Sequence, residues 1–259
     1  MLRTHDVSVE INEKKILENI RFDVPAGKVT ALIGPNGSGK STLLRAISGE
    51  ISYQGKIFIN ERDINSMKAW ELAAIRAVLP QSSSVAFPFT VAEVIHIGLR
   101  NSTNSSTDHL INDALDCVGL LPLAEREYSQ LSGGEQQRVQ LARVLAQVWS
   151  PLVDGSTKWI FLDEPVSSLD ISYQLEVMDI MKNYANHGGG VLTIMHDLNL
   201  TAMYADNVGL LHNGKLLCFG APSDVMNNKI LSEAYSCKIK VNETPKNNKI
   251  FILPQATDI

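Results

Sequence analysis

The chain has 259 residues, of which 44% are hydrophobic, and a formal net charge of −5. This length is enough to bury a substantial core, in one large domain or two small ones. Proteins that bind nucleic acid are more often basic, so the net negative charge argues against that class.

The cysteines and the apolar runs exclude further classes. The three cysteines are odd in number and form no Cys-x-x-Cys pair, so neither a disulfide framework nor a cysteine metal site is expected. No apolar run approaches the roughly 20 residues that a membrane-spanning helix needs, and the N-terminus is too polar for a signal peptide. We therefore expect a cytoplasmic protein that reaches a membrane only by docking to a partner.

The first recognisable elements surround a glycine-rich segment. Residues 29–33 (VTALI) are typical of a buried strand, and residues 42–47 of a helix. Between them, residues 34–41 (GPNGSGKS) match the phosphate-loop pattern G-x-x-x-x-G-K-[ST]. Glycines let backbone N–H groups turn toward phosphate oxygens, and the helix N-terminus adds partial positive charge. The flanking strand and helix disfavour the alternative, a chance glycine-rich turn.

This pattern predicts a nucleotide site with defined roles for its polar residues. Lys40 would neutralise the terminal phosphates, and the Ser41 hydroxyl would ligate Mg²⁺. The residues predicted to bind nucleotide here are Gly34, Pro35, Asn36, Gly37, Ser38, Gly39, Lys40, Ser41 and Thr42.

The next part of the chain changes from mixed to helical. Strands are expected at 57–59 and 76–79, whereas about 82–150 is predicted to be all-helical. One helical pattern ends at Leu99, and the polar stretch 101–108 (NSTNSSTD) follows as a linker. Thr107 or Asp108 is expected to cap a helix that runs to Val118. A further helix follows Gly134, with four apolar residues on one face: Leu141, Val144, Leu145 and Val148.

The hexapeptide LSGGEQ, residues 131–136, begins this last helix. Ser132 can serve as N-cap, and Glu135 lies three residues later, which is the spacing of a capping box. Gly133 and Gly134 permit close approach of another molecule to the backbone. The segment is therefore either a well-capped helix or a second phosphate-binding N-terminus, and the hexapeptide alone leaves both interpretations open.

Strand and helix patterns alternate again in the second half. Residues 159–162 (WIFL) and 191–195 (VLTIM) are typical of buried strands, and helical segments follow each, so a parallel sheet covered on both faces is expected. The first of these strands ends in Asp163 and Glu164. Asp163 suits an anchor for Mg²⁺, and Glu164 suits the positioning of an attacking water. From about residue 208 short strands and small helices are expected.

The order GPNGSGKS, LSGGEQ and LDEP resembles that of the nucleotide-binding subunits of ABC transporters. The likeness covers essentially the whole chain, and LSGGEQ is specific because other phosphate-loop ATPases lack it. The resemblance implies an α/β fold, a phosphate-loop NTPase core with a small antiparallel β region and an inserted helical subdomain. It also implies one ABC ATP-binding domain over 1–259, with its core at about 1–81 and 151–259 and the helical subdomain at about 82–150.

The resemblance assigns roles to further residues. Gln81 resembles the glutamine that senses Mg²⁺ and the membrane partner, and His196 the switch histidine at the terminal phosphate, so Gln81, Glu164 and His196 form the expected catalytic set. As a lone residue, His196 would more often be a core or surface histidine. The expected Mg²⁺ ligands are Ser41, Gln81 and, through water, Asp163. Residues expected to contact ATP of a second subunit are Ser132, Gly133, Gly134 and Glu135; the expected dimer-crossing loop is Ser168, Leu169 and Asp170.

The implied assembly is a homodimer with ATP and Mg²⁺ between its chains, docked on two copies of a multi-span permease at the cytoplasmic side of the inner membrane. Phe87, Phe89 and Val91 are either apolar contacts to that permease or packed inside the helical subdomain. Two residues depart from the family pattern. Val166 replaces a common threonine, and Ile11 stands where an adenine-stacking aromatic residue is usual.

Two segments indicate the cargo. Residues 76–100 resemble importers of iron-siderophores, cobalamin and heme, and the extra loop 150–158 before WIFLDEP resembles heme (hemin) importer ATPases. The expected cargo is therefore heme, with a periplasmic or secreted heme-binding protein as an indirect partner; iron-siderophore or cobalamin is the alternative. A non-transport ABC ATPase is disfavoured by the single phosphate loop, the lack of heptads and the negative charge.

Overall fold

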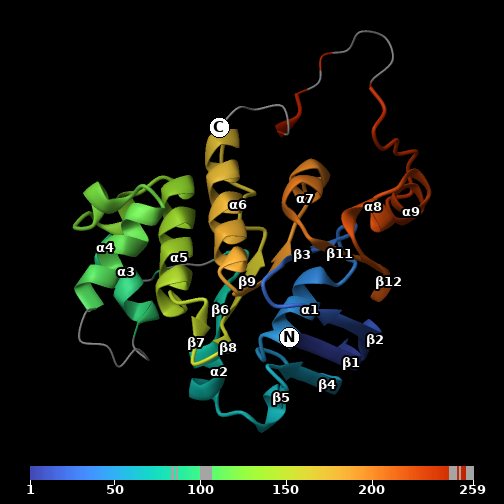
Figure 1. The fold of residues 1–259 in the computed structure, drawn as a ribbon, viewed down its shortest axis with the longest axis horizontal. Coiled ribbons are helices and arrows are strands. Elements are labelled where there is room, and N and C mark those ends of the chain that lie inside the picture. The colour runs from blue at the N-terminus through green and yellow to red at the C-terminus, as the bar shows by residue number, and fades with distance from the viewer. Residues whose placement is uncertain (83–84, 86, 100–106, 245–249, 251, 255–259) are drawn as a thin grey trace.

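The structure is a computed structural model that describes residues 1–82, 85, 87–99, 107–244, 250 and 252–254. These residues form two larger β-sheets, a two-stranded hairpin and a group of helices (Figure 1). Among the described residues, no helix is long and apolar enough to cross a membrane. The arrangement confirms the predicted fold class, an α/β core with a small antiparallel region and a helical insertion.

The N-terminal region forms an antiparallel sheet. Its strand order is β2-β1-β4-β5, and the strands are β1 (Leu2–Ile11), β2 (Lys14–Val24), β4 (Gln54–Ile59) and β5 (Arg62–Asp63). Buried and exposed residues alternate along the second half of β2, from Ile20 to Val24, as they do in a sheet with one covered face. The sequence pattern alone could therefore have predicted this part of β2, whereas the antiparallel sheet was expected only from the family resemblance.

A second sheet of six strands carries the site. Its order is β12-β11-β3-β10-β9-β6, and every neighbouring pair is parallel except β11 and β12. The strands are β3 (Val29–Ile33), β6 (Arg76–Leu79), β9 (Trp159–Asp163), β10 (Gly190–Ile194), β11 (Asn207–His212) and β12 (Lys215–Gly220). All residues of β3, β9 and β10 are buried, which explains why their sequences are mostly apolar.

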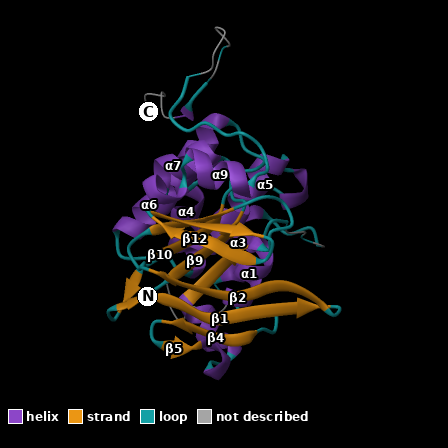
Figure 2. Ribbon diagram, turned by 90° about the vertical axis from the view of Figure 1, so that its right-hand side faces the viewer, coloured by secondary structure: helices purple, strands orange, loops and turns teal. Residues whose placement is uncertain are grey.

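The two faces of this sheet pack on different layers. Along β9, Ile160 and Leu162 belong to one hydrophobic cluster, and Trp159 and Phe161 to the other. The first cluster includes the helices α5 (Gly133–Gln147), α6 (Ile171–Asn186) and α7 (Leu198–Tyr204), and the second includes α1 (Lys40–Ile47) and the antiparallel sheet. Figure 2 shows the antiparallel sheet as a separate layer below the six-stranded one. Smaller helices are α2 (Ala69–Ile75), α8 (Pro222–Val225) and α9 (Asn228–Ala234).

The helical arm, residues 87–99 and 107–147, lies to one side of the core (Figure 1). It contains α3 (Val91–Gly98), α4 (Thr107–Cys117), α5 and short 3-10 turns at Leu121–Leu123 and Tyr128–Gln130. The predicted apolar face of α5 is confirmed, because Leu141, Val144, Leu145 and Val148 are all buried. Helix α4 begins at Thr107, so Asp108 lies in its first turn and is not its cap; linker residues 101–106 fall outside the described part.

The segment expected as an extra loop at 150–158 contains a small hairpin, β7 (Leu152–Val153) with β8 (Ser156–Thr157). Asn60 connects it to the antiparallel sheet, because its Nδ2 donates to Ser156 Oγ at 3.0 Å and to the Thr157 carbonyl at 2.7 Å. The indole nitrogen of Trp159 donates to Asn60 Oδ1 at 3.1 Å. The hairpin therefore links β9 to the turn between β4 and β5.

Candidate active site

The phosphate loop connects β3 to α1, as the sequence predicts. Gly34 has φ +143, and a Cβ built there would lie 2.1 Å from the Leu211 carbonyl oxygen. Gly39 has φ +100 immediately before α1, and a Cβ there would lie 2.6 Å from the Leu17 side chain. Both positions therefore require glycine, because any other residue meets strain or a clash.

Lys40 turns its side chain into this loop. The ammonium donates to the carbonyl oxygens of Gly34 at 2.9 Å and Pro35 at 3.1 Å, and the residue is buried. Burial lowers the pKa of Lys40, and the nearby carboxylates of Glu164 and Asp163 oppose that change. The positive charge of Lys40 is thus held against the backbone of the phosphate loop.

Asp163 ends β9 as a buried carboxylate. Burial raises its pKa, while a hydrogen bond with the Ser41 hydroxyl opposes the rise. Its Oδ1 is buried and has no hydrogen-bond partner among the described residues. A carboxylate oxygen without a protein partner beside a hydroxyl is a donor set that suits a hard cation such as Mg²⁺. The residues present therefore fit the metal that the sequence predicts.

Glu164, Gln81 and His196 come together although they are far apart in sequence. Glu164 Oε1 accepts a hydrogen bond from Gln81 Nε2 at 3.0 Å and lies 2.6 Å from His196 Nε2. The three residues follow β9, β6 and β10, which are neighbouring parallel strands. Parallel strands end at the same edge of a sheet, and that edge is where ligands bind in open α/β folds.

These residues and the phosphate loop line one cleft of about 710 Å³. From the loop and α1 come Asn36, Gly37, Gly39, Lys40, Ser41 and Thr42, and from the strand ends come Gln81, Glu164 and His196. Strand β2 adds Lys14 and Ile16, which sequence reasoning missed because nothing in their pattern points to a nucleotide. Ile11 pairs with Lys14 across the β1–β2 hairpin and is 41% exposed, so its contact with adenine stays a prediction.

The LSGGEQ segment forms the predicted capping box at the start of α5. Ser132 Oγ accepts from the Glu135 backbone N–H at 3.3 Å, and Glu135 Oε2 accepts from the Ser132 N–H at 2.8 Å. A Cβ built on Gly133 would meet no atom of the described residues within 4 Å, so the helix start has open space beside it. Residues 132–135 are not among the described residues that line the phosphate-loop cleft of their own chain.

The dimer-crossing loop predicted at 168–170 leads from this edge into α6. Ser168 and Asp170 are exposed, and Leu169 is half-buried. The Asp170 carboxylate accepts from the Tyr173 N–H at 3.1 Å and thereby caps α6. The loop therefore presents its polar side chains at the surface next to α5.

Comparison with known proteins identifies the family. The profile described as ABC transporter matches residues 17–167, more than half of the chain. The chain belongs to the ABC transporter family. It is similar to the hemin import ATP-binding protein HmuV of Roseobacter denitrificans, with 52% identity over 98% of this chain and 97% of that protein. The namesake of Mesorhizobium japonicum is 48% identical over 99% of both chains.

Solved structures share the fold of this ABC chain. An ATP-binding subunit of an ABC transporter superimposes with a TM-score of 0.78 at 22% identity, covering 92% of this chain and 94% of that one. The ATP-binding cassette MJ1267 gives 0.79 at 25% identity over 91% and 98%. A bacterial Atm1-family ABC exporter gives 0.78 at 24%, although this chain covers only 42% of it. The fold is thus shared by separate ATP-binding subunits and by an ABC exporter.

Three residues of the ABC chain bear on the remaining expectations. Val166, where the family commonly has threonine, is buried in the core. Val91 is fully buried in the helical arm, so it follows the packing alternative and is not a surface contact. Phe87 is 69% exposed, and its ring contacts that of Phe89 edge-on at 6.1 Å between centroids.

One contact to the phosphate loop carried no sequence signal. The Tyr235 hydroxyl, just after α9, accepts a hydrogen bond from the Gly34 N–H at 3.1 Å. The two residues are 201 positions apart in the chain. The C-terminal helices therefore support the loop in a way that no local pattern predicts.

Proposed function

We propose that this chain is the ATP-hydrolysing subunit that powers the import of hemin through a membrane permease. The observation that carries the chemistry is the convergence of Glu164, Gln81 and His196 beside the phosphate loop. Relatives that are 44–52% identical over nearly the whole chain are named hemin import ATP-binding proteins, which supports the cargo.

The phosphate loop binds the triphosphate of ATP. Its backbone N–H groups and the N-terminus of α1 meet the phosphate oxygens, and Lys40 supplies a full positive charge to the terminal phosphates. Ser41, Gln81 and, through water, Asp163 would hold Mg²⁺, which supplies charge neutralisation at the phosphates when bound.

Hydrolysis then needs one oriented water. The Glu164 carboxylate takes a proton from this water as its oxygen attacks the terminal phosphorus, and the bond to ADP breaks. His196 and Gln81 hold Oε1 of Glu164, which lines the cleft. His196 also reaches the terminal phosphate. The products are ADP and inorganic phosphate.

Two chains act together in this proposal. Each ATP lies between residues 34–41 of one chain and residues 132–134 of the other, with Glu135 capping the helix start and residues 168–170 crossing the dimer. The capped N-terminus of α5 supports this role, because residues 132–135 are not among the described residues that line the cleft of their own chain, and a helix N-terminus carries partial positive charge. ATP thereby links the chains and favours the closed dimer.

The dimer docks on two permease copies at the cytoplasmic side of the inner membrane, and a periplasmic or secreted heme-binding protein delivers cargo to the permease. Exposed Phe87 and the surface near Gln81 are the proposed contact. Iron-siderophore or cobalamin import is the second candidate, because the segment 76–100 resembles importers of all three cargoes.

The hydrolysis assignment is tested with purified protein. Glu164→Gln keeps the shape of the side chain but removes the basic carboxylate, so the rate should fall on the order of 10²–10⁴-fold. ATP binding should survive, whereas Lys40→Ala should weaken binding itself. The control is Glu125→Gln, an exposed glutamate of the arm, which should behave as wild type. Wild-type turnover by Glu164→Gln would show that another group is the base.

A further inference from the structure

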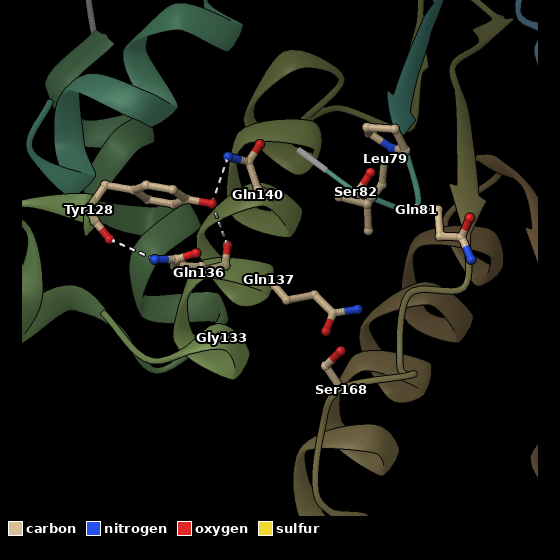
Figure 3. Close-up of a pocket in the computed structure, with 10 residues that line it drawn as sticks. Leu79, Gln81, Ser82, Tyr128, Gly133, Gln136, Gln137, Gln140 and Ser168 are labelled. Carbon is tan, nitrogen blue, oxygen red and sulfur yellow. Dashed lines mark hydrogen bonds between the residues drawn. The ribbon is translucent and has the colours of Figure 1, made fainter. Parts of the chain in front are cut away.

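A small polar cavity of about 170 Å³ lies between the helical arm and the core. Figure 3 shows Gln136, Gln137 and Gln140 of α5 on one side, and Gln81, Ser82 and Ser168 on the other. The Gln137 side chain extends from α5 across this space toward Ser168. The cavity thus lies where the arm faces the edge of the sheet that carries Glu164.

Gln137 holds the backbone of the candidate base from the arm. Its Nε2 donates to the carbonyl oxygen of Pro165 at 2.7 Å and to that of Glu164 at 3.3 Å. Its Oε1 is buried without a hydrogen-bond partner in the described part of the chain. One side-chain amide therefore binds two successive backbone carbonyls.

The Glu164 backbone needs such support. Its φ is +55, in the left-handed region that residues other than glycine rarely adopt, and such strain persists only where the surroundings impose it. The Glu164 N–H donates to the Ile194 carbonyl at 3.3 Å, and its carbonyl accepts from the Ser167 hydroxyl at 3.2 Å and from the Ser167 N–H at 3.4 Å. These contacts come from the core, and Gln137 adds the contact from the arm.

We propose that Gln137 is a positioning residue for hydrolysis: it sets the backbone of Glu164, and hence the aim of its carboxylate, from the helix that begins with LSGGEQ. This inference rests on the proposed role of Glu164 as base. Gln137 lies five residues after Ser132 on that helix, or roughly 7.5 Å along the axis. The helix proposed to contact the partner's ATP therefore also holds the base for this chain's own ATP.

A glutamine at the other end of α5 provides a matched control. Gln147 Nε2 also donates to two carbonyls, that of Ala73 at 2.9 Å and that of Arg76 at 3.1 Å. Neither acceptor lies near Glu164 in sequence, and neither belongs to the phosphate loop or to LSGGEQ. Replacing either glutamine by methionine keeps the length of the side chain and removes the donor, so only the position of the lost bonds differs.

The first measurement is steady-state hydrolysis by the full chain. Gln137→Met should lower kcat by 10-fold to 10²-fold while KM for ATP changes less than about threefold, because misplacing a reacting group costs up to about 10²-fold. Gln147→Met should keep kcat within about threefold of wild type. Gln137→Glu, of the same size but without a donor, is the second variant and should show the same loss. Circular dichroism and ATP binding identify any variant that fails to fold.

The second measurement separates positioning from general support. In a Glu164→Gln background, Gln137→Met should cause no further loss of the residual rate, because a residue that acts through Glu164 is not additive with it. The proposal is overturned if folded Gln137→Met and Gln137→Glu both turn over at the wild-type rate, or if the loss is as large in the Glu164→Gln background. Wild-type turnover by Glu164→Gln alone would instead refute the role of Glu164.

Discussion

At the scale of single residues, hydrogen bonds within the chain hold the polar side chains of the candidate site in place. Lys40 donates to two carbonyls of the phosphate loop, and Glu164 Oε1 is shared by Gln81 and His196. Asp163 Oδ1 has no hydrogen-bond partner in the described chain. A buried oxygen without a hydrogen-bond partner costs free energy, and a cation bound to Asp163 would remove this cost.

Ile11 tests how the base of ATP is held. It is the cross-strand neighbour of Lys14, which lines the cleft, but it offers no aromatic face. Stacking on an aromatic ring is worth roughly 1–3 kcal/mol. Ile11→Tyr should tighten ATP binding by about 1 kcal/mol, or fivefold, and leave the maximal rate nearly unaltered, because the ring would touch ground and transition states alike.

The affinity can be measured by calorimetry or nucleotide fluorescence. Ile97→Tyr on α3, where the isoleucine is similarly exposed, is the control for a surface tyrosine. Unchanged affinity in Ile11→Tyr would mean that adenine does not lie against residue 11.

At the scale of elements, two short segments lead to predictions: the hairpin at 152–157 and the capped start of α5. Asn60 holds the hairpin to the antiparallel sheet by hydrogen bonds. Ser132 and Glu135 cap the first turn of α5. The first connection concerns stability and the second concerns assembly, so they predict different phenotypes.

Asn60→Gly should destabilise the fold without changing hydrolysis. Glycine tolerates the φ of +51 at this position, so the change isolates three side-chain hydrogen bonds. Each is worth about 1 kcal/mol net, and we expect a loss of 1–3 kcal/mol in the free energy of unfolding. Asn12→Gly, at φ +49 in the β1–β2 turn, is the control for the backbone change. Equal unfolding midpoints for the two variants would show that the side-chain hydrogen bonds of Asn60 do not stabilise the fold.

Ser132→Arg should abolish ATP-driven dimerisation. In a Glu164→Gln background with ATP, light scattering should give twice the chain mass of 28.4 kDa, and with ADP the mass of one chain. An arginine at residue 132 would fill the space meant for the partner's phosphate and leave a monomer. Ser129→Arg, an exposed serine of the same arm, should still dimerise. A dimer that forms without ATP would contradict the proposed sandwich.

At the scale of the whole molecule, the chain combines a cleft in the core, lined by the phosphate loop, with a helical arm that exposes Phe87. The core and the arm share one hydrophobic cluster, which extends from β3 and β9 into α3, α4 and α5. This cluster is a packed connection between the arm and the sheet, and under the proposed function it would be the route by which permease docking is coupled to hydrolysis.

The cargo is a property of the assembly and is tested in cells. A strain lacking this chain should not grow with heme as its sole iron source. The wild-type chain should restore growth, and Glu164→Gln should not, because the subunit is present but cannot hydrolyse ATP. Normal growth on heme with lost use of siderophore or cobalamin would redirect the cargo and leave the ATPase assignment intact.

The sequence by itself determined the features that are local along the chain. The phosphate loop could be read because residues 34–41 combine glycines, Lys40 and Ser41 between a strand and a helix. The capping box at Ser132 and the buried strands at 29–33 and 159–162 could be read for the same reason: each depends on neighbours within a few positions. The order of the motifs added the family and, with it, the roles that we propose for Gln81 and His196.

Only the tertiary structure decided which distant residues meet. The strand order places β6, β9 and β10 side by side, so Gln81, Glu164 and His196 share one edge although up to 115 positions separate them. The supports of the site are of the same kind: Tyr235 binds the loop at Gly34, and Gln137 binds the carbonyls beside Glu164. A single tyrosine or glutamine has no pattern of its own, because its role comes from the partner that folding brings to it.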